Sequence, residues 1–124
     1  MNPSARSKRI LEAKGFMVAI VERWIQQARK RIDAFGFADL MAIIDGPKGV
    51  LAVQATTGSN FSAHITKILQ LETVPVWLDA GNRIQVHGWR LAGARGKRKL
   101  WACRRVEIVF GFNGLAWKEL EEWP

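Results

Sequence analysis

The sequence contains a single cysteine and no long apolar run, and these absences exclude several classes of protein. Cys103 alone cannot form an internal disulfide framework or a zinc site made of several cysteines. No run of 18 apolar residues occurs, so no transmembrane helix is predicted. The first residues, Met1–Ser4, are followed by charged residues instead of an apolar segment, which argues against a secretory signal and makes the cytoplasm the expected compartment.

Other chemical signatures are missing as well. His64 and His87 show no metal-ligand spacing with each other or with Cys103, so no zinc site is predicted. Cys103 lacks a nearby histidine to activate it, and its neighbours indicate an inward-facing strand residue. The glycine-rich basic segments lack the Walker spacing of a phosphate-binding loop, and no recognition-helix motif is present, so sequence-specific DNA readout is not indicated.

Composition favours a folded domain with an anionic partner. The 124 residues fit one domain, residues 1–124, and 48% of them are hydrophobic, which provides a core and argues against disorder. Lys and Arg number 19 against 11 Asp and Glu, a formal net charge of +8. Nucleic acid is the first candidate partner, and an anionic membrane surface or an acidic protein is the second. A basic protein that is merely soluble is the remaining interpretation.

Apolar patterning and turn residues predict an α/β fold in which a mixed central sheet is flanked by helices. Strands are expected wherever a short β-branched or alternating run occurs, and helices where apolar residues recur at helical spacing. The predicted helices are residues 5–14, 61–72 and 74–80. The predicted strands are residues 16–21, 37–44, 50–56, 84–89 and 100–110. Residues 22–31 are expected to form a loop or partial helix, and residues 115–123 a short helix or tail.

One pair of polar residues suggests a site. Asp39 opens a buried strand, and Gln54 interrupts the next apolar strand fifteen positions later. Because the turn at residues 45–49 is short, the two strands should pair as a hairpin and bring Asp39 and Gln54 to the same end of the sheet. Carboxylate and amide oxygens suit Mg²⁺ or Mn²⁺, which would activate water and stabilise charge on a phosphodiester. We therefore take Asp39 and Gln54 as candidate metal ligands.

The stretches Gly36–Ala42 and Val53–Thr56 resemble the acid-bearing strand entry and the acid-x-lysine strand of the P-D…(D/E)-x-K phosphodiesterases. Within this restriction-endonuclease-like superfamily, the chain resembles small Holliday junction resolvases, Mrr-type endonucleases and VRR-NUC domains. The resemblance covers residues 6 to 89 and implies a restriction-endonuclease-like core, Mg²⁺-dependent cleavage of DNA, and an N-terminal helical glutamate, here Glu12. Resolving members act as dimers, which implies a homodimer if this function holds.

The chain departs from the family pattern at two positions. Gln54 replaces the acid, a variant known in the superfamily, and Thr56 replaces the lysine that helps to polarise the water. Threonine cannot supply that positive charge. We hypothesise that Lys67, or His64 in its place, reaches back from the following helix to the same site.

Each candidate also has a structural interpretation. In the structural interpretation Asp39 caps a turn or pairs with Arg31, and Gln54 satisfies its amide in a structural hydrogen bond. Asp33 and Glu22 are competing acids for the same site. Glu12 on a helix surface would also be an ordinary solvated charge.

The basic residues are clustered rather than dispersed. Residues 83–105 contain eight Lys or Arg and no acid, and residues 1–31 contain another eight against Glu12 and Glu22. The candidate nucleic-acid contacts are Arg90, Arg95, Lys97, Arg98 and Lys99. They would follow a phosphate backbone without reading sequence, although a solvated charged face is the alternative. Trp89, beside Arg90, is the preferred tryptophan for stacking on an unpaired base, against core packing as the alternative.

Three functions are compatible with these features. The first is a metal-dependent nuclease acting on DNA, including branched or junction DNA. The second is a catalytically degenerate nucleic-acid-binding protein on the same fold, as the missing lysine would suggest. The third is a basic protein that binds a membrane surface or an acidic partner.

Overall fold

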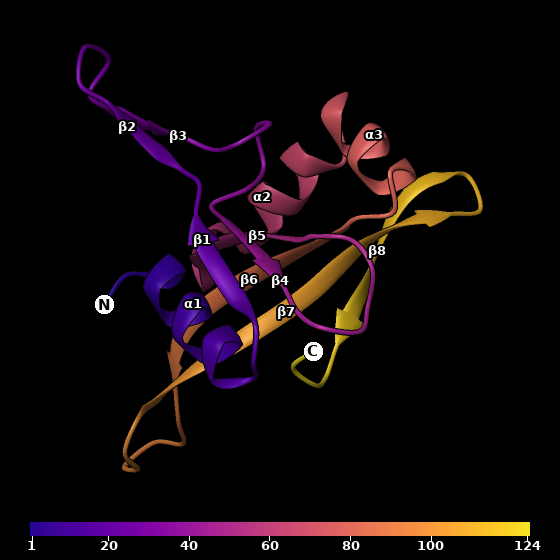
Figure 1. The fold of residues 1–124 in the computed structure, drawn as a ribbon. Coiled ribbons are helices and arrows are strands. Elements are labelled where there is room, and N and C mark those ends of the chain that lie inside the picture. Colours follow the sequence, from indigo (N-terminus) through magenta and orange to yellow (C-terminus); the bar gives the residue numbers. More distant parts are fainter.

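The computed structural model describes all 124 residues, and they form a six-stranded mixed sheet with helices on both faces and a separate two-stranded hairpin (Figure 1). The α/β class with a mixed central sheet is thereby confirmed. The main sheet has the strand order β1-β4-β5-β6-β7-β8. The strands of this sheet are β1 Met17–Ile20, β4 Leu40–Ile43, β5 Leu51–Thr57, β6 Arg83–Ala92, β7 Leu100–Gly111 and β8 Gly114–Leu120.

The helices are α1 Pro3–Ala13, α2 Phe61–Ile68 and α3 Thr73–Asp79, with a 3-10 turn, η1, at Gly58–Asn60. The single helix expected over 61–72 therefore ends at Ile68, and a second helix follows after a short break. No helix in the structure combines the length and apolar character needed to cross a membrane.

The strand pairing explains how distant segments meet. β1, β4 and β5 are neighbours and antiparallel, and the hairpin predicted from the short turn between β4 and β5 is confirmed. β6 runs parallel to β5, so the chain must cross between them, and η1, α2 and α3 lie in this connection. β7 and β8 then add two antiparallel strands.

The N-terminal helix starts two residues before its expected position. The Asn2 side chain caps the helix by accepting a hydrogen bond from the Ala5 amide at 2.8 Å. Pro3 occupies the first helical position, where a backbone N–H would have no partner within the helix, so the absence of this group in proline costs nothing. Gly15 ends the helix with a φ of +100°, a conformation that favours glycine.

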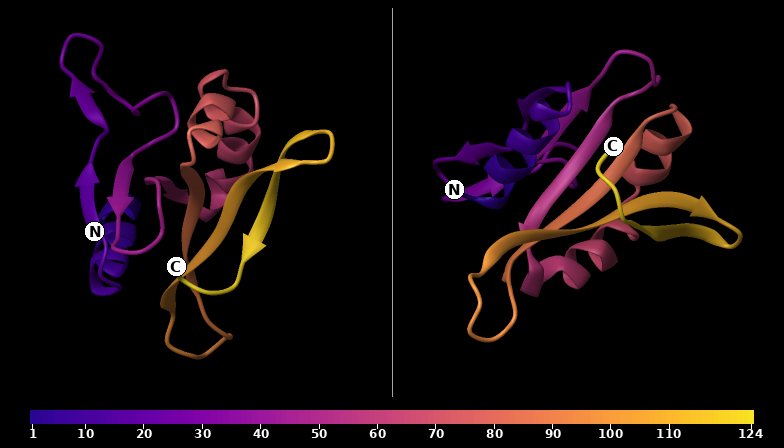
Figure 2. Two further views of the ribbon diagram at one scale, coloured as in Figure 1. Left: turned by 45° about the vertical axis from the view of Figure 1, so that its right-hand side comes forward. Right: turned by 90° about the horizontal axis from the view of Figure 1, so that it is seen from below.

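Successive side chains along a strand point to opposite faces of the sheet, and this produces one apolar layer on each face. Leu51 and Val53 of β5 face α1, whereas Ala52 faces α2 and α3. The two helical faces are separated by the sheet in the rotated views (Figure 2). α2 approaches the sheet closely because Gly88 of β6 has no side chain: a Cβ there would lie 2.5 Å from Cδ1 of Phe61.

The segment predicted to be a loop or partial helix is instead a hairpin. β2 (Arg23–Ile25) pairs with β3 (Lys30–Ile32), and the hairpin projects from the sheet in Figure 1. Residues 26–29 have good helix propensity, which is why a partial helix was expected, and this expectation was wrong. These residues form only the turn of the hairpin, in which Arg29 adopts a φ of +49°. Pairing of the flanking residues overrides this local preference.

The C-terminal segment is also not a helix. It forms β8, which pairs along the whole of its length with β7. The two strands are joined by the short turn at Phe112 and Asn113, and Gly114 follows with a φ of +117°. Asn-Gly between apolar runs is a hairpin signal that the helical interpretation overlooked. The strand expected over residues 84–89 extends to Ala92 as β6, and residues 93–99 form the loop at the tip of the β6–β7 hairpin.

Candidate metal-binding and catalytic site

Three acidic side chains meet where the β2–β3 hairpin joins the sheet. Glu22 precedes β2 and Asp33 follows β3, so the pairing of Arg23 with Ile32 places these two acids at the base of the hairpin. Asp39, immediately before β4, is the third. One carboxylate oxygen from each of the three lies within 4.8 Å of the others. We call Glu22, Asp33 and Asp39 the acidic cluster.

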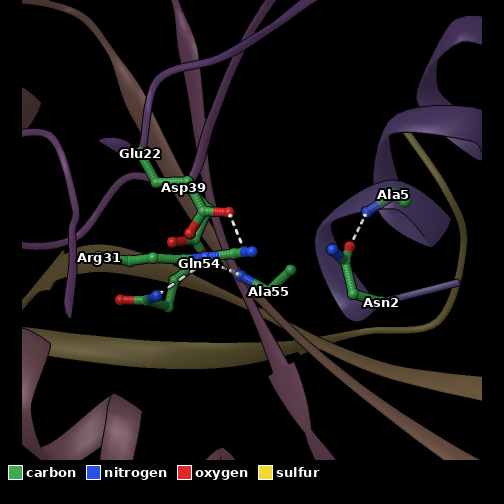
Figure 3. Close-up of polar contacts among 7 residues, drawn as sticks. All are labelled: Asn2, Ala5, Glu22, Arg31, Asp39, Gln54 and Ala55. Carbon is green, nitrogen blue, oxygen red and sulfur yellow. Dashed lines mark hydrogen bonds and ion pairs between the residues drawn. The ribbon is translucent and has the colours of Figure 1, made fainter. Parts of the chain in front are cut away.

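Asp39 is anchored by the neighbouring strand. Its Oδ2 accepts hydrogen bonds from Nε2 of Gln54 at 2.9 Å and from the Ala55 amide at 2.8 Å (Figure 3). The predicted proximity of Asp39 and Gln54 at one end of the sheet is therefore confirmed. Both side chains are almost fully buried, at 3% and 2% exposure. Gln54 makes the structural hydrogen bond considered above, while its Oε1 has no hydrogen-bond partner.

The acidic cluster holds Asp39 in an environment that disfavours negative charge. Burial, a hydrogen bond with Asp33, and the charges of Asp33 and Glu22 raise the pKa of Asp39 to about 8, against the opposing effect of the Ala55 amide. Asp39 is therefore protonated at neutral pH when no cation is bound. A cation at this position would replace that proton.

Two basic side chains approach the acidic cluster from different elements. Nζ of Lys67, on α2, lies 3.8 Å from Oδ2 of Asp33. Nη1 of Arg31, on β3, donates to Oε1 of Glu22 at 3.1 Å (Figure 3). The alternative pairing of Arg31 with Asp39 is thus replaced by a pairing with Glu22. Lys67 reaches the site from the helix that the sequence hypothesis named.

His64 lies one turn before Lys67 on α2. Burial, followed by the charge of Lys67, lowers its pKa, and Asp33 acts in the opposite direction. Its Nδ1 is buried without a hydrogen-bond partner. His64 is therefore a neighbour of the site, and Lys67 is the side chain of α2 that contacts Asp33. Thr56 lies two residues beyond Gln54 on the same face of β5 and adds no charge.

The donor set fits a hard divalent cation. It contains three carboxylates, and turning the Gln54 amide by half a rotation would put its unpartnered Oε1 where Nε2 now meets Asp39. Oxygen donors of this kind are the ligands that Mg²⁺ and Mn²⁺ accept. The residues that would hold the ion are Asp39, Asp33 and Glu22, with Gln54 as a further oxygen donor.

Glu12 is not among the residues that meet here. It lies on the exposed surface of α1 and pairs with Lys8 one turn earlier, with Nζ at 3.0 Å from Oε1. This is the arrangement of a solvated helix charge. From the sequence, Glu22 and Asp33 were expected only as competitors of Asp39 for the same site. That all three acids meet could not be seen without the β2–β3 hairpin, because its strand pairing places Glu22 and Asp33 beside Asp39.

The predicted nucleic-acid contacts lie on the β6–β7 hairpin. Arg95, Lys97, Arg98 and Lys99 are exposed in the loop at its tip. Arg90 lines a separate cleft of about 340 Å³, together with Ser59, Ser62 and Arg104. Arg104 also hydrogen-bonds to Glu119.

The tryptophan chosen for base stacking is unsuitable. Trp89 is only 5% exposed, and its Nε1 donates to Oγ of Ser7 at 2.9 Å, because this position of β6 faces α1. That interpretation was wrong. Trp24 in β2 is instead 53% exposed and lies beside the acidic cluster.

Comparison of the chain with protein-family models, with curated proteins and with solved structures found no significant match.

Proposed function

We propose that this protein is a metal-dependent nuclease that hydrolyses phosphodiester bonds in DNA, including branched DNA, on a restriction-endonuclease-like core. The observation that carries the proposal is the acidic cluster of Glu22, Asp33 and Asp39, with Lys67 at 3.8 Å from Asp33. Three buried or half-buried carboxylates that contact one another are electrostatically costly, and a bound divalent cation would relieve that cost. Asp39 and Gln54 also occupy the two positions that the family resemblance assigns to the metal.

The distribution of positive charge supports a polynucleotide substrate. By strand register, β1 ends opposite the start of β4, so the β2–β3 hairpin leaves the sheet at the end where Asp39 lies. β6 runs parallel to β5 and extends past this end, carrying the basic β6–β7 loop. Both basic hairpins therefore extend from the end of the sheet that holds the acidic cluster, the β2–β3 hairpin toward the top and the β6–β7 loop toward the bottom of Figure 1. A phosphate backbone that contacts both hairpins would pass over the acidic cluster.

Each side chain then has a distinct task. Bound Mg²⁺ would activate water and stabilise the charge that develops on the phosphodiester. Ala55 and Gln54 hold the Asp39 carboxyl group in place, and Arg31 does the same for Glu22. Lys67 supplies the positive charge that Thr56 lacks and can donate hydrogen bonds to the attacking water or to a phosphate oxygen. The exposed basic residues bind the backbone on either side.

The decisive experiment is cleavage of labelled four-way-junction, flap, single-stranded and duplex DNA with Mg²⁺ or Mn²⁺. Wild type is compared with Asp39→Asn and with Asp45→Asn, which removes an acid from the exposed turn after β4. We expect metal-dependent cutting by wild type and Asp45→Asn and none by Asp39→Asn. The preferred substrate then defines the biological role.

A second pair of variants tests the role of Lys67. Lys67→Ala should lower the cleavage rate at least about 100-fold, the usual range for loss of a group that acts on the reacting atoms, while DNA binding is retained. Lys48→Ala, which removes an exposed charge in the β4–β5 turn, should behave as wild type. Metal-dependent cutting that is unchanged in Lys67→Ala would refute this role. Salt-sensitive binding without any cleavage would instead favour the degenerate, binding-only form of the fold.

A further inference from the structure

A cleft of about 320 Å³ opens beside the acidic cluster, between the base of the β2–β3 hairpin and the start of α1. Glu22 belongs to both the cleft and the acidic cluster, so the two are contiguous. The wall formed by the hairpin contains Arg23, Trp24 and Arg31, and the opposite wall contains Asn2 and Ser4. Figure 3 shows Asn2 on one side and Arg31, Glu22 and Asp39 on the other.

Trp24 presents a fixed aromatic surface to this cleft. Its side chain is 53% exposed although it belongs to a paired strand, and its Nε1 donates to Oε1 of Gln26 at 3.0 Å. This hydrogen bond holds the indole orientation without burying the ring. An exposed aromatic face beside basic side chains is the combination on which unpaired bases stack.

The charges around Trp24 suit the phosphates on either side of such a base. The hairpin from Arg23 to Ile32 contains four basic residues and no acid. Arg31 is bound to Glu22 and remains 59% exposed, so its guanidinium can also contact a phosphate. Across the cleft, Asn2 uses Oδ1 to cap α1, which leaves its amide nitrogen free to donate to a base.

The size of the cleft limits what it can contain. Its volume is near the lower end of the roughly 300–1,000 Å³ of clefts that hold small organic ligands. A single base with its sugar is small enough to enter a cleft of this size.

We propose that this cleft binds a single unpaired nucleotide of the DNA substrate, stacked on Trp24, and so directs the nuclease to DNA that is single-stranded beside the cleavage site. This proposal rests on the proposed function, because it takes the adjacent acidic cluster to be the cleavage site. The experiment that tests it measures DNA binding and not cleavage. Continuous duplex would lack the unpaired base, whereas flaps, forks and junctions with open arms would provide it.

The test compares the affinity for three DNAs, measured by fluorescence anisotropy with Mg²⁺ in an Asp39→Asn background that prevents cutting. The probes are a duplex with a single-stranded flap, a fully paired duplex of the same length, and the flapped duplex with abasic flap nucleotides. The variants are Trp24→Ala, Trp24→Phe and the control Trp117→Ala, which removes a similarly exposed ring from β8. None of these removes a buried core side chain.

Trp24→Ala should weaken binding to the flapped DNA by about tenfold, the magnitude of one lost base–aromatic stack. The same change should leave binding to the duplex and to the abasic flap essentially unaltered, because neither offers a base to stack. Trp24→Phe should restore most of the affinity, and Trp117→Ala should have no effect. These outcomes together support a nucleotide subsite.

Equal losses on flapped and paired DNA would overturn the proposal, since the hairpin would then contact duplex. An unchanged flap affinity in Trp24→Ala, or a loss of the same size with the abasic flap, would overturn it as well. Failure of the nuclease function is a separate result: wild type would cleave none of the substrates while the flap preference still depended on Trp24. Conversely, cleavage of these substrates without any Trp24-dependent preference would retain the nuclease and remove the subsite.

Discussion

At the scale of single residues, Asp39 combines burial with two like-charged neighbours. Its pKa is raised to about 8 from an ordinary value of 3.8. The folded protein therefore binds a proton that the unfolded chain releases above pH 4. This proton contributes stability that is complete below pH 4 and is lost as the pH rises through 8.

We predict that, without divalent metal, the unfolding free energy of the wild type falls between pH 6 and pH 9, and that this fall is largely absent in Asp39→Asn. Asparagine cannot ionise, but its oxygen can still accept the Ala55 hydrogen bond. At pH 9 the variant should be more stable than wild type by at least about 1 kcal/mol, since one pKa unit corresponds to roughly 1.4 kcal/mol. Urea denaturation across this pH range measures the difference, with Asp45→Asn as the control. Parallel pH profiles of the three proteins would contradict the prediction.

Ser7 and His87 form a second buried polar group, on the opposite face of the sheet. Trp89 Nε1 can only donate, so Ser7 Oγ accepts from it at 2.9 Å and donates in turn to His87 Nδ1 at 2.8 Å. His87 Nε2 then carries the proton and donates to Oε1 of Gln85 at 3.0 Å. Burial, then the charge of Arg105, lowers the pKa of His87 to about 3, so this network is neutral at physiological pH.

Ser7→Ala should therefore destabilise the protein by about 1–3 kcal/mol, because it leaves two buried groups, Trp89 Nε1 and His87 Nδ1, without their shared partner. Ser62→Ala, an exposed serine on α2, is the matched control and should change stability by less than about 0.5 kcal/mol. Chemical denaturation followed by circular dichroism measures both. A loss no larger in Ser7→Ala than in the control would show that these hydrogen bonds are not important for stability.

At the scale of elements, the position of α2 depends on the missing side chain of Gly88. Phe61, the first residue of α2, packs directly over this glycine. α2 also carries Lys67 to the acidic cluster, so a shift of the helix would move its ammonium group away from Asp33.

Gly88→Ala should cost about 1–3 kcal/mol of stability, the range for forcing an extra methyl group into a packed core, and should lower the cleavage rate as Lys67 is displaced. Adding Phe61→Leu, which shortens the opposing side chain, should recover part of both losses in the double variant. Thermal unfolding and the cleavage assay provide the two measurements. If the effects of the two substitutions were simply additive, direct contact between residues 61 and 88 would not be the cause of the losses in Gly88→Ala.

The sequence predicted most elements and failed at two hairpins. Helix and strand patterns for α1, β1, β4, β5, α3 and β7 were readable because their apolar residues repeat at the spacing of the buried face. The β2–β3 segment has no such repeat, and its turn residues favour helix. β8 was missed although Asn113-Gly114 marks its turn. In both cases pairing with a partner strand decides the structure, and local propensity does not.

At the scale of the whole molecule, we propose that the two basic hairpins that extend from the sheet end with the acidic cluster hold the DNA. Replacing Arg95, Lys97, Arg98 and Lys99 together by glutamine should weaken binding to duplex and flapped DNA alike. If all four contact phosphates, the slope of log affinity against log salt concentration should become shallower by about 3 to 4, since each contact contributes roughly 0.9. Anisotropy titrations at several salt concentrations measure it. An unchanged slope would show that the β6–β7 loop is a solvated charged face.

The sequence by itself determined the α/β class, the β4–β5 hairpin, the meeting of Asp39 with Gln54, and the basic β6–β7 loop. These follow from local periodicity, one short turn and a run of like charges, all of which act over a few residues. Only the tertiary structure decided that Glu22 and Asp33 join Asp39, that Glu12 stays apart, and that Trp24 faces the cleft while Trp89 is buried. Those outcomes depend on which strands pair and which face of the sheet each helix covers. Such contacts between distant segments are set by the packing of the whole chain.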